Sequence, residues 1–248
     1  MVNVKEIAKY LDQELDITGF EDSSCNGLQV ENVEEIKKIG FAVDACKETF
    51  EKAVNCGCQM LITHHGMIWN GLKYIKGNNY QKLKYLFDNN LSLYAAHLPL
   101  DAHNKYGNNA QLAELLNLKD LKAFGYHNGK AIGFIGNTDT SLEEIKKILS
   151  EKGMKDFTLP FGPENIKKVA IVSGCGAKEA IQAVAVGADL YLTGEPKHGN
   201  YHLAKENKIN IIFGGHYETE VWGVKALMPL LKERFAVETE FIDVPTPI

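Results

Sequence analysis

The stretch IKKIGFAVDACKETFEKAVNCGCQMLITHHG at residues 36–66 matches a second stretch, IKKVAIVSGCGAKEAIQAVAVGADLYLTGEP, at residues 166–196. The match needs no gap, since each residue of the first copy pairs with the residue 130 positions later. Each copy contains an apolar run, a helical stretch that ends at a glycine (Gly57 or Gly187), and a second apolar run. This order predicts a strand, a helix and a parallel strand, the βαβ unit. Because spacing and element type repeat together, the two copies indicate an internal duplication.

The pattern continues outward from both copies. Each is followed by one more expected helix and strand, at 80–89 and 91–96 in the first half and at 198–205 and 209–213 in the second. The segment 130–162 predicts a further strand, helix and strand, and its helix opens on the capping pair Ser141 and Glu144. We therefore predict an α/β fold of two similar, interlocked three-layer halves with mainly parallel central strands.

The expected boundary between the halves lies in the turn near residue 126. It divides the chain into 1–126, with the paired histidines and the first His/Asp motif, and 127–248, with the His/Glu motif. The C-terminal helix, expected from Val221, is free to pack across the first half.

Composition places the chain among ordinary globular proteins. Its 248 residues are 45% hydrophobic and 24% charged, and the net charge of −5 gives no general attraction to nucleic acid or to an anionic membrane. The five cysteines form no disulfide framework, and the pair Cys56 and Cys58 has no second pair to complete a soft-metal site. The N-terminus reads as an amphipathic helix and no apolar run reaches membrane-spanning length, so we expect a soluble, cytoplasmic protein.

Histidines follow three of the predicted strands at the point where each strand ends. His64 and His65 follow the strand at 60–63, His97 follows the strand at 93–96, and His216 follows the strand at 211–213. Open α/β sheets form their sites at the carboxyl ends of strands, so these side chains are expected to meet there.

Two of these histidines carry an acidic residue four positions later. The pairs are His97 with Asp101 and His216 with Glu220, and on a helical turn this spacing puts both side chains on one face. The duplication thus repeats a ligand pattern as well as a fold. Imidazole with carboxylate suits zinc, iron or manganese, and five or six ligands exceed what one tetrahedral ion takes, so we predict a two-metal centre for hydrolytic chemistry. The alternative, that these histidines are caps or hydrogen-bonded packing residues, remains open at this point.

Two other residues have uses that the sequence leaves open. Glu195 occupies the position of His65 in the second copy, where it either lines the site or sits in a solvated turn. Trp69 either stacks on a planar substrate or packs against protein. Phosphate-loop, dinucleotide-binding and nucleophile-elbow motifs are absent from the sequence.

Five short motifs spread over almost the whole chain resemble one known family. The chain is similar to the Nif-three-like family of dinuclear metal proteins, which includes the homologues of GTP cyclohydrolase 1 type 2. The motifs are CNGLQV at 25–30, ITHHG at 62–66, AAHLPLDAH at 95–103, LTGE at 192–195 and GHYETE at 215–220.

The resemblance implies an assembly and a ligand set. The assembly is a ring-like homohexamer, and Glu220 is the expected bridge between the two ions. His97 is implied to be a neighbour of the metals, and we expect it to shuttle protons. Many relatives have proline after the paired histidines, whereas this chain has Gly66, which is expected to loosen the loop. The implied ligands are His64, His65, Asp101, His216 and Glu220.

The resemblance also implies a reaction, the opening of a guanine nucleotide ring by a metal-activated water with release of formate. Two alternatives remain: a two-metal phosphoesterase, and a metal-loaded oligomeric scaffold with a regulatory or nucleic-acid-binding role. A basic surface favours the scaffold, and one modest cluster is formed by Lys73, Lys76, Lys82 and Lys84.

Overall fold

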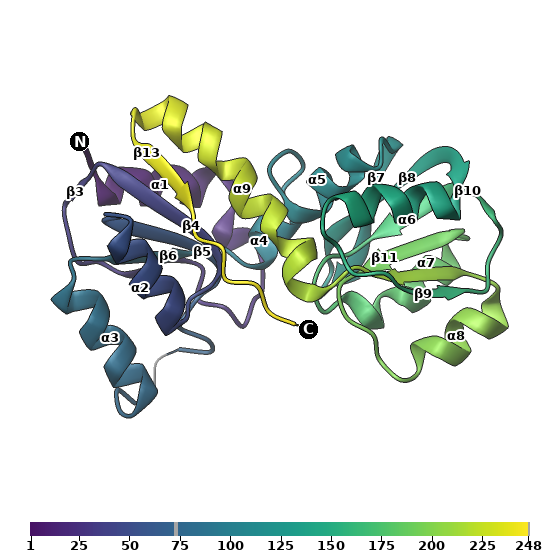
Figure 1. The fold of residues 1–248 in the computed structure, drawn as a ribbon, viewed down its shortest axis with the longest axis horizontal. Coiled ribbons are helices and arrows are strands. Elements are labelled where there is room, and N and C mark those ends of the chain that lie inside the picture. The colour runs from purple at the N-terminus through teal and green to yellow at the C-terminus, as the bar shows by residue number, and fades with distance from the viewer. Residues whose placement is uncertain (72–73, 248) are drawn as a thin grey trace. The chain divides into compact units, whose positions relative to one another are not determined.

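The structure is a computed structural model that describes residues 1–71 and 74–247 (Figure 1). The chain forms two compact units. The first contains residues 1–100 and 223–244, and the second contains residues 101–222 and those from 245 onward. The helices α4 (Leu98–Ala102) and α9 (His216–Phe235) each begin in one unit and end in the other.

The first unit is built on a five-stranded sheet. In spatial order its strands are β13 (Glu238–Phe241), β4 (Lys38–Asp44), β5 (Met60–His65), β6 (Ser92–Ala95) and β2 (Gly27–Val30). The strands β13, β4, β5 and β6 are parallel to one another, and β2 pairs with β6 in the antiparallel direction. A separate pair joins β1 (Val2–Asn3) to β3 (Glu35–Ile36), and the short helix η1 is Ile17–Gly19.

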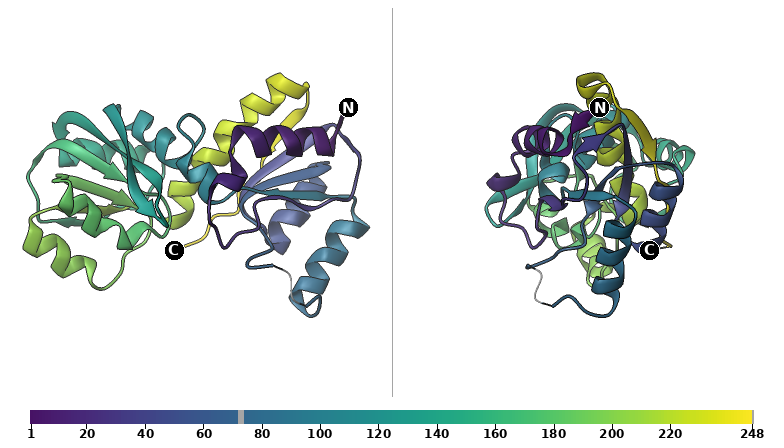
Figure 2. Two further views of the ribbon diagram at one scale, coloured as in Figure 1. Left: turned by 180° about the vertical axis from the view of Figure 1, so that it is seen from behind. Right: turned by 90° about the vertical axis from the view of Figure 1, so that its left-hand side faces the viewer.

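Helices cover both faces of this sheet (Figure 1 and Figure 2). The helices α2 (Lys47–Asn55) and α3 (Asn78–Asp88) pack on one face, where Phe50 and Leu86 join Leu93 of β6 in a buried cluster. The next residue of β6, Tyr94, points to the other face and donates a hydrogen bond to Asp12 of α1 (Val4–Glu14) over 2.9 Å. The C-terminal end of α9 contacts α1 through an aromatic pair.

The second unit is built on a six-stranded sheet. Its order is β7 (Lys119–His127), β8 (Lys130–Ser141), β10 (Asn165–Ile171), β11 (Leu190–Thr193), β12 (Asn210–Phe213) and β9 (Phe157–Pro160). The central strands β10, β11 and β12 are parallel, and antiparallel strands flank them on both sides.

Helices again cover both faces. A buried cluster packs α5 (Asn108–Leu115) and α6 (Leu142–Glu151) on the side chains of Leu190 and Leu192. Tyr191, between those two leucines, faces the other layer and donates a hydrogen bond of 2.6 Å to the carbonyl of Gly176. That layer contains η2 (Gly176–Lys178), α7 (Ala180–Ala185) and α8 (Asn200–Asn207).

The structure confirms the predicted fold class, because both copies of the repeat form parallel βαβ units. The predicted cap is present as well, since Ser141 Oγ accepts a hydrogen bond from the backbone N–H of Glu144 at the start of α6. The units are divided differently from the sequence-based boundary at 126. Residues 101–126 group with the second sheet because β7 forms a hairpin with β8 and α5 packs in the core of that sheet.

In the described part of the chain, no helix has both the length and the apolar character that crossing a membrane requires.

Candidate metal centre

Three histidines gather in the first unit, where β5 and β6 end side by side. His64 and His65 are the last residues of β5, and His97 lies two residues beyond β6. One donor atom from each histidine lies within 4.8 Å of the others. The imidazole centroids are 4.7 Å apart for His64 and His65 and 5.1 Å apart for His64 and His97. The parallel register therefore creates a group of three nitrogen donors.

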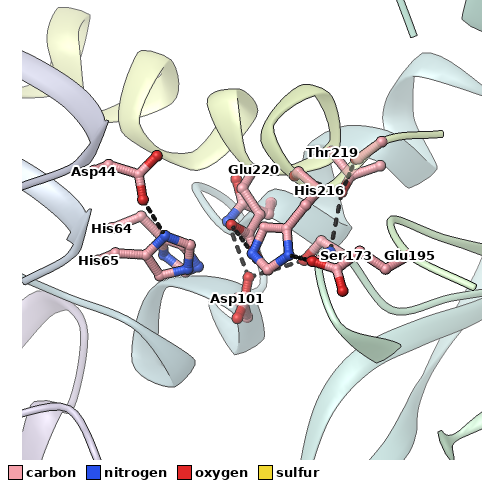
Figure 3. A network of polar contacts seen from close by, with 12 residues as sticks. Asp44, His64, His65, Asp101, Ser173, Glu195, His216, Thr219 and Glu220 are labelled. Carbon is pink, nitrogen blue, oxygen red and sulfur yellow. Dashed lines mark hydrogen bonds and ion pairs between the residues drawn. The ribbon is translucent and has the colours of Figure 1, made fainter. Parts of the chain in front are cut away.

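The outer nitrogen of each paired histidine is held by an oxygen. The Nδ1 of His64 lies 3.0 Å from the carbonyl oxygen of Ala96, and since a carbonyl only accepts, Nδ1 carries the proton. The Nδ1 of His65 donates over 2.8 Å to the carboxylate of Asp44, the last residue of β4 (Figure 3). In both rings the lone pair is then on Nε2, the arrangement found in metal-ligating histidines.

His97 has a carboxylate partner of its own. Both oxygens of Asp22 lie near its Nδ1, at 2.9 and 3.1 Å, and Asp22 also accepts hydrogen bonds from the Asn26 side chain and from the backbone N–H of Ser24 and Leu98. Burial raises the pKa of the Asp22 carboxyl, but these hydrogen bonds and the charge of His97 outweigh it and hold the pKa well below its usual range. Asp22 is thus an ionised acceptor that fixes the His97 ring.

The second unit gathers two carboxylates and one imidazole. His216 opens α9 and Glu220 follows one turn later, so His216 Nε2 lies 3.0 Å from Glu220 Oε2 (Figure 3). An oxygen of Asp101 lies within 4.8 Å of an oxygen of Glu220. Both carboxylates are buried, with exposed fractions of 5% for Asp101 and 3% for Glu220. Two buried carboxylates at this separation repel each other, and a cation between them relieves that repulsion.

The carboxylate of Asp101 is oriented by polar neighbours from other elements. Ser173 Oγ and Asn108 Nδ2 each donate to Asp101 Oδ1 over 2.9 Å. Asn109 in turn accepts a hydrogen bond of 2.7 Å from the backbone N–H of Ser173. These contacts fix one oxygen of Asp101 and leave its orientation little freedom.

His216 lies between two carboxylates. Its Nδ1 donates to Glu195, which follows β11, and its Nε2 faces Glu220. Burial lowers the pKa of His216, but the hydrogen bonds and charges of Glu220 and Glu195 dominate and raise the pKa to about 9. The surroundings therefore favour positive charge at this point.

Gly174 brings the backbone close to Glu220. It has a positive φ of 59° and its N–H donates to Thr219 Oγ1 over 3.0 Å. A Cβ at this position would collide with the Glu220 carboxylate. Only glycine therefore suits both the turn and the close approach.

We expect Gly174→Ala to destabilise the protein by more than the roughly 1–2 kcal/mol of a left-handed alanine, because it must also displace Glu220. Gly57→Ala is the matched control, since Gly57 also has a positive φ of 75° but has no atom within 4 Å of the added Cβ. Urea unfolding of both variants measures the difference. Equal losses of stability in the two variants would show that the close approach to Glu220 does not contribute to the effect of Gly174→Ala.

The donor set fits divalent metal ions. The described residues contain groups of His, Asp and Glu able to hold a metal ion, and no cysteine takes part in those groups. Imidazole and carboxylate donors with fixed outer nitrogens suit zinc, iron or manganese. The C-x-C pair does not join them: Cys56 is exposed, whereas Cys58 is buried and burial raises its thiol pKa to about 12.

The six side chains that the sequence singled out lie in these two clusters, but the sequence did not indicate the residues that orient them. Asp44 ends a predicted strand of the first repeat, which was an available signal. Ser173 likewise follows the first strand of the second repeat, whereas Asp22 had no such signal because it lies in a loop outside both copies. Glu195, for which the sequence left two uses open, proves to contact His216.

Gly66 does not loosen its loop as expected. A Cβ on Gly66 would collide with the side chain of Gln29 and with Ala95, so the backbone is packed closely there. Gln29 also accepts hydrogen bonds from the N–H groups of Met67 and Ile68. Glycine is therefore needed here because it has no Cβ and lets the backbone approach Gln29 and Ala95 closely, and not because it makes the loop flexible.

Two lysines of the basic cluster have partners within the described part of the chain. Lys84 pairs with Asp88 at 2.6 Å, and Lys82 donates to the carbonyl of Ala45 over 3.0 Å. Lys73 lies outside the described residues.

A family model and several named proteins match this chain over almost its full length. The family model described as Duf34/NIF3 (NGG1p interacting factor 3) matches residues 2–247. A protein of Archaeoglobus fulgidus named GTP cyclohydrolase 1 type 2 homolog is 45% identical over 247 residues, which cover 99% of both chains. A protein of Pyrococcus abyssi with the same name is 47% identical over 246 residues, with 98% of both chains covered.

Solved structures share the fold. The crystal structure of TTHA1606 from Thermus thermophilus has a TM-score of 0.92 and 38% identity, with all of both chains covered. Reduced HcgD from Methanocaldococcus jannaschii has a TM-score of 0.86 and 31% identity, with 98% of both chains covered.

Proposed function

Because the chain belongs to the Duf34/NIF3 (NGG1p interacting factor 3) family, we propose that its two clusters together bind two divalent metal ions and catalyse a hydrolysis. The ligands in this proposal are one donor atom each from His64, His65, Asp101, His216 and Glu220. Zinc, iron and manganese are the ions that the donors suit.

One observation supports this proposal more than any other: the buried carboxylates of Asp101 and Glu220 lie within 4.8 Å of each other beside the imidazole of His216. Buried carboxylates that lie this close together need positive charge nearby, and divalent metal ions supply it. The paired histidines add neutral donors whose outer nitrogens are already held by oxygen. Glu220 has two carboxylate oxygens and would be able to hold more than one ion.

Two bound divalent ions supply an activated water at neutral pH and stabilise negative charge that develops on the substrate. The chain itself supplies the proton transfers. Asp22 lies against Nδ1 of His97 and so leaves Nε2 as the ring nitrogen that would take up a proton and return it to a leaving nitrogen. His97 is therefore the proposed proton shuttle.

We propose a guanine nucleotide as the substrate, since close relatives carry the name GTP cyclohydrolase 1 type 2 homolog. Two water molecules are consumed in this reaction. The first adds to the carbon between the two imidazole nitrogens and opens the ring, and the second releases that carbon as formate. The proposed assembly is a homohexamer, which light scattering tests.

Formate release from GTP tests the proposed activity. Purified protein reconstituted with zinc, iron or manganese is expected to release formate, and chelation should abolish the release until the same ion is restored. Phosphate release without formate would instead identify a phosphoesterase. Neither product, together with salt-dependent binding of nucleic acid, would identify a scaffold and overturn the hydrolase.

A further inference from the structure

The first unit contains a pocket of about 550 Å³ next to the histidine cluster. Its wall includes Trp69, whose ring centroid lies 5.0 Å from that of His97 and 6.1 Å from that of His65. The volume is within the range of small-molecule sites, about 300–1,000 Å³. Trp69 therefore lines the pocket and also lies near a proposed metal ligand, His65, and the proposed proton shuttle, His97.

Trp69 is held in place by its own loop. Its indole Nε1–H donates to the carbonyl of Gly66 over 2.8 Å. The next residue, Asn70, donates its backbone N–H to the carbonyl of Ser23 over 2.7 Å. Gln29 accepts from the two residues that precede Trp69, as described above. The ring is consequently preorganised, and a ligand that stacks on it does not have to order it.

The pocket combines aromatic, amide and cationic groups. Trp69 is 36% exposed and Tyr74 is 71% exposed, although large aromatic side chains are usually covered. Asn70 and Asn79 also line the pocket, and Lys76 places its Nζ 5.3 Å from the centre of the Tyr74 ring. Aromatic faces bind planar rings, amides pair with their polar edges, and a lysine binds an anion.

We propose that this pocket is the subsite for the heteroaromatic ring of a small anionic substrate, a purine nucleotide, with Trp69 as the residue on which the base stacks. The inference rests on the proposed function, because it places the ring beside the metal ligands. The acidic net charge and the ion pair of Lys84 with Asp88 favour a mononucleotide over a nucleic-acid strand.

The binding test uses Trp222→Phe protein, in which Trp69 is the remaining one of two tryptophans and reports on its own surroundings. The probes are guanosine monophosphate, guanosine and ribose 5-phosphate. We expect the first two to quench the emission of Trp69, and we expect ribose 5-phosphate not to quench it and to compete only far more weakly than guanosine monophosphate.

Calorimetric titration then compares variants. Trp69→Ala is expected to weaken binding of guanosine monophosphate by roughly 5- to 150-fold, the range for loss of one base-stacking residue, and Trp69→Phe by less. Lys76→Ala is expected to weaken guanosine monophosphate but not guanosine. Tyr126→Ala is the control, since Tyr126 is an exposed aromatic of the second unit that does not line the pocket.

Unchanged affinity in both Trp69 variants, or equal binding of ribose 5-phosphate, would overturn the subsite, as would much tighter binding of a single-stranded oligonucleotide. The failure of the subsite is distinguishable from that of the proposed function. If the Trp69 variants release formate and bind the nucleotide with normal affinity, only the subsite is wrong. If nucleotide binding depends on Trp69 but no formate is released, only the proposed cyclohydrolase activity is wrong.

Discussion

Glu220→Gln protein is expected to fold but to lose its metal, with affinity falling by more than the roughly 10- to 100-fold that loss of an orienting partner costs. Glutamine keeps the shape of the side chain and removes the negative charge. Without that charge one buried carboxylate and one imidazole remain in the second unit, and no bridging oxygen remains. Elemental analysis after dialysis against buffered metal measures the loss, and formate release should fall to the level of the chelated wild type.

Glu218→Gln is the matched control for this prediction. It makes the same substitution one half-turn earlier in α9, where Glu218 lies 3.7 Å from Lys155 and takes no part in the cluster. This variant should keep its full metal content. If Glu220→Gln also kept it, Glu220 would be a packing residue and the assignment of a bridging ligand would be wrong.

His97→Ala is expected to cut turnover by roughly 10²- to 10⁴-fold while metal content stays unchanged, because the proton shuttle is lost and the ligands remain. Turnover and metal content are measured on the same preparation. His103→Ala is the control, since His103 follows α4 and stacks on Tyr106 with centroids 5.2 Å apart. Loss of metal in the His97 variant would instead make His97 a ligand.

Asp22, the hydrogen-bond partner of His97, allows a second test of the proton shuttle. Asp22→Asn should lower turnover by less than His97→Ala, because the ring stays but loses its fixed orientation. The double variant should match His97→Ala alone to within about 0.5 kcal/mol, since Asp22 acts only through His97. Additive losses would show that Asp22 has a separate role.

Periodicity and duplication were sufficient to predict the layers and the parallel centre of each sheet. A repeated apolar run, helix and apolar run permits few other folds, and parallel register then brings His64, His65 and His97 to one sheet edge. The unit boundary was not predictable in the same way. The segment 101–126 has no strong pattern of its own, and its place depends on tertiary pairing of β7 with β8.

The orienting residues depend on contacts between segments distant in the chain. Asp22 reaches His97 across 75 residues and Ser173 reaches Asp101 across 72. The spacing of neither residue along the chain indicates its partner, because the two contacts form only when distant segments meet in the fold. Spacing therefore indicated the candidate donors, whereas the hydrogen bonds that orient them become visible only in the folded structure.

X-ray absorption spectroscopy of the metal-loaded protein tests the central claim most directly. If both clusters bind a single dinuclear centre, the spectrum should contain a metal–metal scattering path at roughly 3.5–4 Å, with about two ions per chain by elemental analysis. Oxygen and nitrogen should surround the ions, without sulfur. A spectrum without that path, at one ion per chain or at two isolated ions, would contradict the account.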